Sequence, residues 1–200
     1  MNDVCAPVEY RVDRDNRIIW VNDAWQCFAA QNGGVDLTDE RVIGQSVLEF
    51  VSGKVSKQYW ELLLDSVRTG CQPLMIEYRC DSPDMRRNML MQLRPNEFGT
   101  VHIVSLLLSS QQRSRAIDIR CAKQRSKQTS MRCSVCNRVK YHESWREVDD
   151  IFASAKTQLP ILLVTYAICP DCRAMLPANH ADPSPIVSSR TDSRNGQNTL

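Results

Sequence analysis

The sequence contains little that would place the protein in a membrane or outside the cell. A membrane-spanning helix needs a stretch of about 18 apolar residues, and the sequence has none. Its longer apolar runs, such as residues 161–164, are far below that length. The N-terminal residues lack the basic start and the apolar segment of a signal peptide. Nine cysteines are an odd number, which does not fit a fully paired disulfide framework. We therefore expect a cytoplasmic protein without membrane contact, whose cysteines are thiols or metal ligands.

Glycine and proline are also scarce, at 7 and 9 of 200 residues, which excludes collagen-like chains. A content of 42% hydrophobic and 24% charged residues is typical of globular proteins. This length allows one large domain or two small ones, and we expect two. Residues 1–7 are expected to form an N-terminal tail. Residues 177–200 contain three prolines and few bulky apolar side chains, so we expect them to be disordered.

Positive charge is concentrated in one short segment. The formal net charge is +2, yet residues 113–132 alone contain seven of the 25 Lys and Arg residues and a single acidic residue, Asp118. The segment has too few apolar residues for a core of its own. We expect residues 113–131 to form a basic helical or flexible linker between two domains.

The first half has the local patterns of an α+β fold. Residues 8–13 alternate between apolar and polar side chains, as in a half-buried strand. Asn22 is expected to cap a helix, and Ser56 a longer helix that ends at Gly70. In that helix Trp60, Leu63, Leu64 and Val67 recur at helical spacing. Further strands are predicted at residues 18–21, 74–80, 89–93 and 100–108. This order favours a five-stranded antiparallel sheet with helices on one face.

At residues 8–112 the chain resembles a PAS domain of the bacterial sensor type. The resemblance is carried by VDRDNRIIWVNDAW at 12–25, VIGQSVLEFV at 42–51, RTG at 68–70 and GTVHIVSLLLSSQQR at 99–113. It implies a sensor or interaction module, often dimeric, with a helix-lined pocket for a small ligand. We accordingly expect a homodimer.

The sequence does not identify a ligand for such a pocket. A flavin photosensor of this fold would need a reactive cysteine in the central helices, and haem would need an axial ligand that the helix after Ser56 lacks. The candidate ligand-binding residues are Trp25, Tyr59, Trp60 and His102, which could instead be core or surface residues. Cys27 is expected to be a small buried side chain.

Four cysteines form the strongest chemical signal. Cys133 and Cys136 make one CxxC pair, Cys169 and Cys172 make another, and 32 residues separate the two pairs. Two such pairs supply the four thiolates of a closed structural zinc site. Iron in a rubredoxin-like site uses the same ligands, and a redox pair is the third alternative. His142 lies near the first pair and is expected to be a surface residue.

Residues 132–176 are predicted to be a small zinc-ribbon or zinc-knuckle module. Residues 139–141 have the pattern of a strand, and residues 145–156 that of a helix. The segments MRCSVCNRVKYHESWREVDDIF and YAICPDC resemble the cysteine-rich module at the end of some bacterial PAS proteins and sensor kinases. The resemblance supports zinc and association with signalling.

Two functions remain open at this stage. The first is a cytoplasmic signalling protein, in which a PAS-like domain senses or dimerises and the zinc module contacts a partner protein. The second is a transcription regulator that binds DNA through the basic linker and the zinc module. No nucleotide-binding loop and no catalytic constellation is identifiable, so we expect that the protein is not an enzyme.

Overall fold

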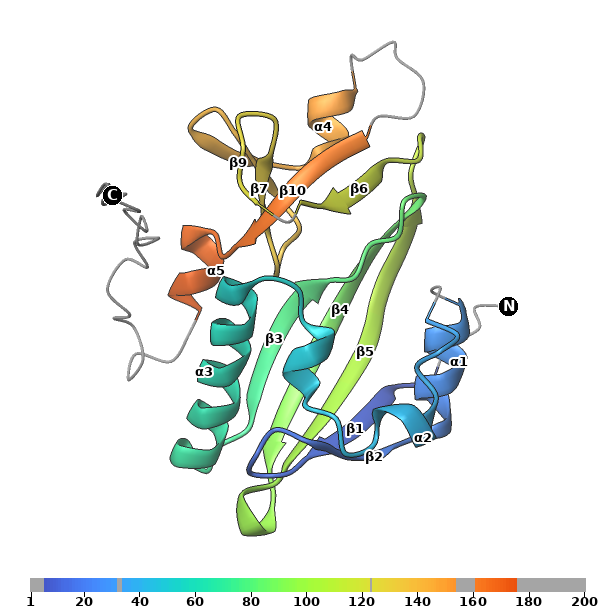
Figure 1. Ribbon diagram of the computed structural model, residues 1–200, viewed down its shortest axis with the longest axis vertical. Coiled ribbons are helices and arrows are strands. Elements are labelled where there is room, and N and C mark those ends of the chain that lie inside the picture. The colour runs from blue at the N-terminus through green and yellow to red at the C-terminus, as the bar shows by residue number, and fades with distance from the viewer. Residues whose placement is uncertain (1–5, 32–33, 123, 154–160, 176–200) are drawn as a thin grey trace, which may run out of the picture.

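The computed structural model describes residues 6–31, 34–122, 124–153 and 161–175, which form two five-stranded sheets (Figure 1). The first sheet has the order β2-β1-β5-β4-β3, and every pair of neighbours is antiparallel. Its strands are β1 (Val8–Val12), β2 (Ile18–Val21), β3 (Leu74–Arg79), β4 (Met85–Pro95) and β5 (Val101–Gln112).

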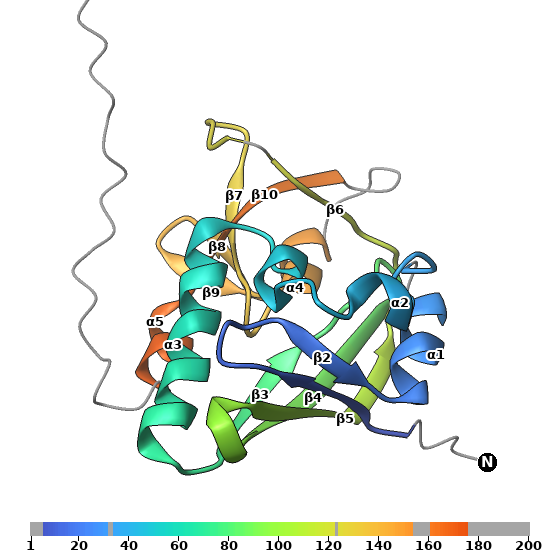
Figure 2. The same ribbon diagram turned by 60° about the horizontal axis from the view of Figure 1, so that its bottom comes forward.

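Three helices and two 3-10 turns accompany this sheet. Figure 2 shows the sheet with α3 and α1 at its two sides. The elements are α1 (Asp23–Gln31), α2 (Asp39–Val42), η1 (Val47–Phe50), α3 (Lys54–Gly70) and η2 (Glu97–Gly99). This architecture confirms the predicted α+β, PAS-like fold class: a five-stranded antiparallel sheet covered by helices.

The register of the strands brings one set of apolar side chains to the helix-covered face. Tyr10 pairs with Ile103, Ile103 pairs with Leu93, and Ile76 pairs with Met91. All five side chains are buried. Because side chains alternate along a strand, residues in register share a face, and this face forms the core. Leu63, Leu64 and Val67 of α3 pack against it and are almost fully buried.

Helix α3 starts three residues earlier than the sequence predicts, with Gly53 rather than Ser56 at the N-cap position. Gly53 precedes it with a φ of 87°, a conformation that favours glycine. A Cβ on Gly53 would lie 3.0 Å from the Cβ of Tyr166, so this glycine also permits close contact with the second sheet. Ser56, expected to be the cap, lies inside the helix, where its buried hydroxyl is hydrogen-bonded to that of Ser134.

The second sheet has the order β6-β10-β7-β8-β9. Strand β10 is parallel to both β6 and β7, whereas β7, β8 and β9 are joined in antiparallel pairs. Two short helices accompany this sheet. Its elements are β6 (Asp118–Cys121), β7 (Ser130–Cys133), β8 (Val139–Tyr141), β9 (Ser144–Arg146), α4 (Val148–Phe152), β10 (Ile161–Ala167) and α5 (Pro170–Ala174).

Two segments differ from the sequence prediction. The expected helical or flexible linker contains β6, preceded by the buried side chain of Ile117. Pairing with β10 satisfies the backbone groups on one side of β6 and holds it at the edge of the sheet. The predicted helix at 145–156 is shorter, because Trp145 lies in β9 opposite Lys140 and the helix begins only at Val148. The expected tail at 177–200 lies outside the described residues.

A buried ion-pair network joins the two sheets. Asp81, which follows β3, lies 2.7 Å from Arg79 and 2.8 Å from Arg113, measured from carboxylate oxygen to guanidinium nitrogen. The same two arginines reach the second sheet, where Arg79 pairs with Glu147 at 3.3 Å and Arg113 pairs with Asp149. The backbone N–H of Arg79 also donates to the carbonyl of Val135 at 2.8 Å. The two sheets therefore meet in a specific, hydrogen-bonded interface.

Candidate functional site

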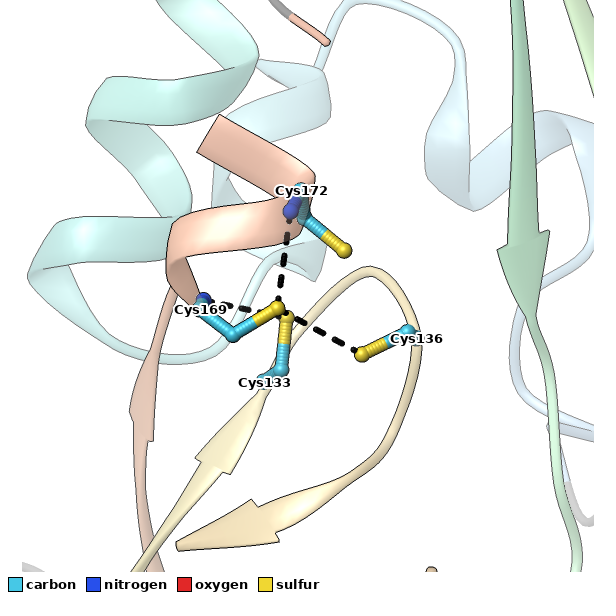
Figure 3. Close-up of side chains that lie close together, drawn as sticks. All are labelled: Cys133, Cys136, Cys169 and Cys172. Atoms are coloured by element: carbon cyan, nitrogen blue, oxygen red, sulfur yellow. Dashed lines mark hydrogen bonds between the residues drawn. The ribbon is translucent and has the colours of Figure 1, made fainter. Parts of the chain in front are cut away.

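The four cysteines of the CxxC pairs converge in the structure (Figure 3). Their sulfur atoms all lie within 4.8 Å of one another. Cys133 ends β7 and Cys136 lies in the turn that follows it, whereas Cys169 and Cys172 come from the start of α5. The cluster is the meeting point of two segments far apart in the chain, as the spacing predicts.

Each CxxC segment forms a tight turn for a local reason. In the first, Asn137 has a left-handed φ of 62°, which asparagine tolerates, and its N–H donates to the carbonyl of Cys133 at 3.0 Å. In the second, Cys169 is the N-cap residue of α5, and Pro170 is the first residue of the helix. The fixed φ of proline suits this first helical position. These turns aim both sulfurs of each pair at the other pair.

Backbone N–H groups stabilise negative charge on the sulfurs. The N–H of Cys169 donates to the Sγ of Cys133 at 3.4 Å, and the N–H of Cys172 donates to the Sγ of Cys169 at 3.5 Å. Hydrogen bonds from Cys136 and Cys172 hold the pKa of Cys133 far below its usual value. The hydrogen bond between Cys136 and Cys133 raises the pKa of Cys136 to about 12. Lowering the pKa of a thiol favours the thiolate, which is the state in which cysteine binds metals.

The donor set and its dimensions fit a tetrahedral metal ion. A zinc ion holds thiolates at about 2.3 Å, which places neighbouring sulfurs about 3.8 Å apart in a tetrahedron. The sulfurs of Cys136 and Cys169 are 3.7 Å apart. Four sulfur ligands would complete the coordination of zinc and leave no position for water or substrate.

The cluster is part of the main hydrophobic core. Cys133 and Cys169 are fully buried, and Cys172 is nearly so. Tyr59 of α3 packs in the same core, and burial together with the nearby Cys172 raises its pKa above the usual range. Helix α5 lies beside α3 in both views of the molecule (Figures 1 and 2). The candidate metal centre is therefore continuous with the PAS-like half.

A cavity of about 470 Å³ lies between the two halves of the molecule. Trp25, Tyr59 and Trp60, three of the four predicted ligand-binding residues, line it. Its opposite wall comes from the turn and strands of the second sheet. That wall contains Arg132, Ser134, Val135, Asn137 and Tyr166.

Three other predicted side chains lie elsewhere. His102 does not line the cavity, because it is on the opposite face of β5, where its Nε2 is 2.9 Å from a carboxylate oxygen of Glu9. Cys27 is exposed on α1, so its expected burial is wrong. His142 is exposed, as expected, and lies outside the cysteine cluster.

The charged end of this cavity was not predicted from the sequence. Arg132 is only 9% exposed, and burial lowers the pKa of its guanidinium while Tyr166 and Asp81 oppose that shift. Arg79 and Asp81 also line the cavity. In the sequence Arg132 and Arg113 belong to the basic segment. Both are buried in the structure, so neither adds to an exposed surface for nucleic acid.

Comparisons with known proteins find neighbours by structure alone. No protein-family model and no curated protein matches the sequence. A sensory box sensor histidine kinase from Vibrio cholerae is 16% identical, with a TM-score of 0.39, over 54% of this chain and 85% of its own. The PAS domain of the Cronobacter turicensis quorum-sensing receptor RpfR, in complex with BDSF, is 14% identical, with a TM-score of 0.42, over 55% and 100%.

A third neighbour is the PAS domain of BvgS from Bordetella pertussis, 18% identical, with a TM-score of 0.36, over 51% of this chain and 72% of its own. Each neighbour thus covers about half of the chain. The fold assignment rests on the strand order and the helices of the structure itself. Among the described residues, no helix is long and apolar enough to cross a membrane.

Proposed function

We propose that the protein is a cytoplasmic signalling protein in which a PAS-like sensor is fastened to a zinc-stabilised C-terminal sheet. The sensor detects a small ligand, and the C-terminal sheet contacts a partner protein. The supporting observation is that the four cysteines lie in the core of the PAS-like half, against Tyr59 of α3. A change in the cavity can therefore alter the position of the zinc-bound turns.

Zinc is the proposed metal because its role here is structural. The four-thiolate set is closed, so the metal would hold Cys133 and Cys136 against Cys169 and Cys172 without binding a substrate. Arg138 and Asp171, one from each CxxC segment, form an ion pair of 2.9 Å beside the cluster. A purely structural metal agrees with the proposal that the protein is not an enzyme.

The output is proposed to be a contact with a protein. The PAS resemblance also supports a homodimer as the working assembly. The C-terminal sheet carries exposed apolar side chains that a partner could cover, among them Tyr141, Ile161 and Leu163. With four thiolates and one zinc ion, residues 133–176 would have a negative formal charge, which favours a protein partner over DNA.

Native mass spectrometry of the purified full-length protein tests the proposal, with the denatured mass as reference. We expect a mass increment of one zinc ion per chain, a two-chain assembly, and a further organic mass where a ligand is retained. Cys136→Ser is expected to lose the stoichiometric zinc. Cys27→Ser, which changes an exposed cysteine outside the cluster, should retain it. Wild-type protein without metal, or iron in place of zinc, would contradict the zinc assignment.

A further inference from the structure

The cavity between the two halves has an apolar wall and a charged wall. Trp25, Trp60 and Leu63 belong to the PAS-like half, and their side chains offer aromatic and aliphatic surface. Arg132 comes from β7 of the second sheet. At about 470 Å³ the cavity is within the range of small-molecule sites. Its lining suits a ligand with an apolar body and one polar end.

Arg132 is a buried cation without a carboxylate partner in the described part of the chain. It is 9% exposed, and its Nε atom has no hydrogen-bond partner there. The other buried arginine of the interface, Arg113, also has an unpaired Nε, but its terminal nitrogens pair with Asp81 and Asp149. Arg132 has a side-chain hydrogen bond with Tyr166, but no carboxylate lies within ion-pair distance of it among the described residues. A buried charge without a counter-ion is costly, which makes an external anion the natural counterpart of Arg132.

Arginines outnumber carboxylates by one in the cavity wall and the ion-pair network behind it. The four arginines are Arg79, Arg86, Arg113 and Arg132, and the three carboxylates are Asp81, Glu147 and Asp149. Asp81 is already held by Arg79 and by Arg113. Arg79 has a further partner in Glu147. The excess is therefore located on Arg132, and a single negative charge would neutralise it.

We propose that this cavity binds a small organic monoanion, whose anionic group pairs with Arg132 and whose apolar body lies against Trp25 and Trp60. This inference rests on the proposed sensor function and names its ligand class. Arg132 directly precedes Cys133 in β7. The ligand would thus contact the same strand that supplies the first cysteine of the metal centre, which links occupancy to the C-terminal sheet.

Two dyes of nearly identical shape test the assignment. Anilinonaphthalene sulfonate carries one negative charge, and N-phenyl-1-naphthylamine is its uncharged counterpart. We expect Arg132→Met to weaken sulfonate binding to the full-length protein by about tenfold or more, measured by fluorescence titration, because a charged hydrogen bond is lost. Binding of the neutral dye should change little. The matched control is Arg94→Met, at an exposed arginine on β4, which should leave both affinities unchanged.

A measurement on the wild-type protein removes the dependence on a stable Arg132→Met variant. The Nε–H signal of Arg132 in a proton–nitrogen NMR spectrum can be assigned by its absence in Arg132→Lys. We expect the sulfonate dye to shift this signal and the neutral dye to leave it in place. If Arg132→Met does not fold, this signal shows whether the anionic dye binds at Arg132.

The unfavourable outcomes are distinct. Equal binding of both dyes, with no shift of the Arg132 signal, would overturn the anion assignment and leave a sensor for a neutral ligand. Binding of neither dye would overturn both the anion assignment and the proposed sensing role. Sulfonate binding that Arg132→Met leaves intact would show that another cation binds the anion, and would also overturn the assignment.

Discussion

The two sheets of this protein are stabilised in different ways. The first sheet is entirely antiparallel and buries a large apolar core, in which Ile18, Leu64 and Leu93 are fully buried. The second sheet is mixed, and the small cluster of its own consists of Ile117, Val139 and Val148 with partly buried neighbours. Most of its remaining buried apolar groups, including Cys133, Val135, Ile168 and Cys169, belong to the core of the first sheet.

This contrast indicates what each half requires in order to fold. Apolar burial of the extent seen in the first sheet is the usual source of domain stability. The second sheet has a small apolar cluster of its own, so we expect it to depend on a metal and on its neighbour. The order of dependence is therefore asymmetric: the second sheet should fail first, and the first sheet should survive its loss.

Metal removal should have the largest effect on stability, and it should affect the second sheet much more than the first. We expect a chelator, or Cys172→Ser, to unfold the second sheet, since structural zinc contributes on the order of 10 kcal/mol in zinc-finger peptides. Hydrogen exchange with mass spectrometry should show loss of protection in β7, β8 and β10 while β4 and β5 stay protected. Leu64→Ala is the control: it should cost about 2–5 kcal/mol in the first core and leave the metal bound. Unchanged protection of β7–β10 without metal would contradict the asymmetry.

Changes in the interface between the sheets should have the second-largest effect on the free energy of unfolding. Asp81→Asn removes the carboxylate that two buried arginines share, so we expect it to lower the free energy of unfolding by about 3–5 kcal/mol. Asp171→Asn breaks the exposed ion pair with Arg138 and should cost no more than about 1 kcal/mol. Chemical denaturation of the metal-loaded proteins measures both values. Equal small effects would mean that the buried network adds little to the interface.

High pH should weaken the first sheet through Tyr10. Burial raises the pKa of Tyr10 above its usual range, so the folded protein keeps its proton while the unfolded chain loses it above a pH of about 10. The tyrosine therefore favours folding at all lower pH values. Above that value, the free energy of unfolding should fall by up to about 1.4 kcal/mol per pH unit. Tyr10→Phe should reduce this slope, and Tyr141→Phe, at an exposed tyrosine, should not. Parallel pH curves for all three proteins would contradict the role of Tyr10.

The smallest expected effect concerns one hydrogen bond across the interface. Ser56 of α3 and Ser134 of the β7–β8 turn are hydrogen-bonded through their hydroxyls. Ser56→Ala and Ser134→Ala should each cost about 1 kcal/mol. A double-mutant cycle should give a coupling of about 0.5–1.5 kcal/mol. Additive effects of the two changes would show that the contact does not link the sheets energetically.

The same contrast explains how much of the fold could be predicted from the sequence. The strands of the first sheet were predicted because each has a local alternation and short turns separate them along most of its length. Strand β6 was not predicted, because its partner β10 lies some 40 residues later and parallel pairing leaves no local turn signal. The length of the helix predicted from Trp145 was overestimated for a related reason. Helical spacing of apolar residues does not show that Trp145 pairs with Lys140 in a sheet.

The candidate sites divide in the same way. The cysteine cluster could be predicted from two CxxC segments, because their spacing alone fixes which sulfurs approach a metal. Of the residues predicted to bind a ligand, Trp25, Tyr59 and Trp60 line the cavity and His102 does not, and ligand binding by any of them stays a prediction. Arg132 was counted in the basic segment at 113–132 and was not predicted to line a cavity, because charge counts do not distinguish a buried guanidinium from an exposed one.

By itself, then, the sequence determined the antiparallel first sheet and the four cysteines, since alternation, turns and short motifs are local properties of the chain. Only the tertiary structure decided that the second sheet shares its core with the first, and that Arg132 faces a cavity between them. Those features depend on contacts between residues far apart in the sequence, such as Ser56 with Ser134 and Asp81 with Arg113. Burial and pairing arise from such contacts, and they decide whether a charge is free to bind a ligand.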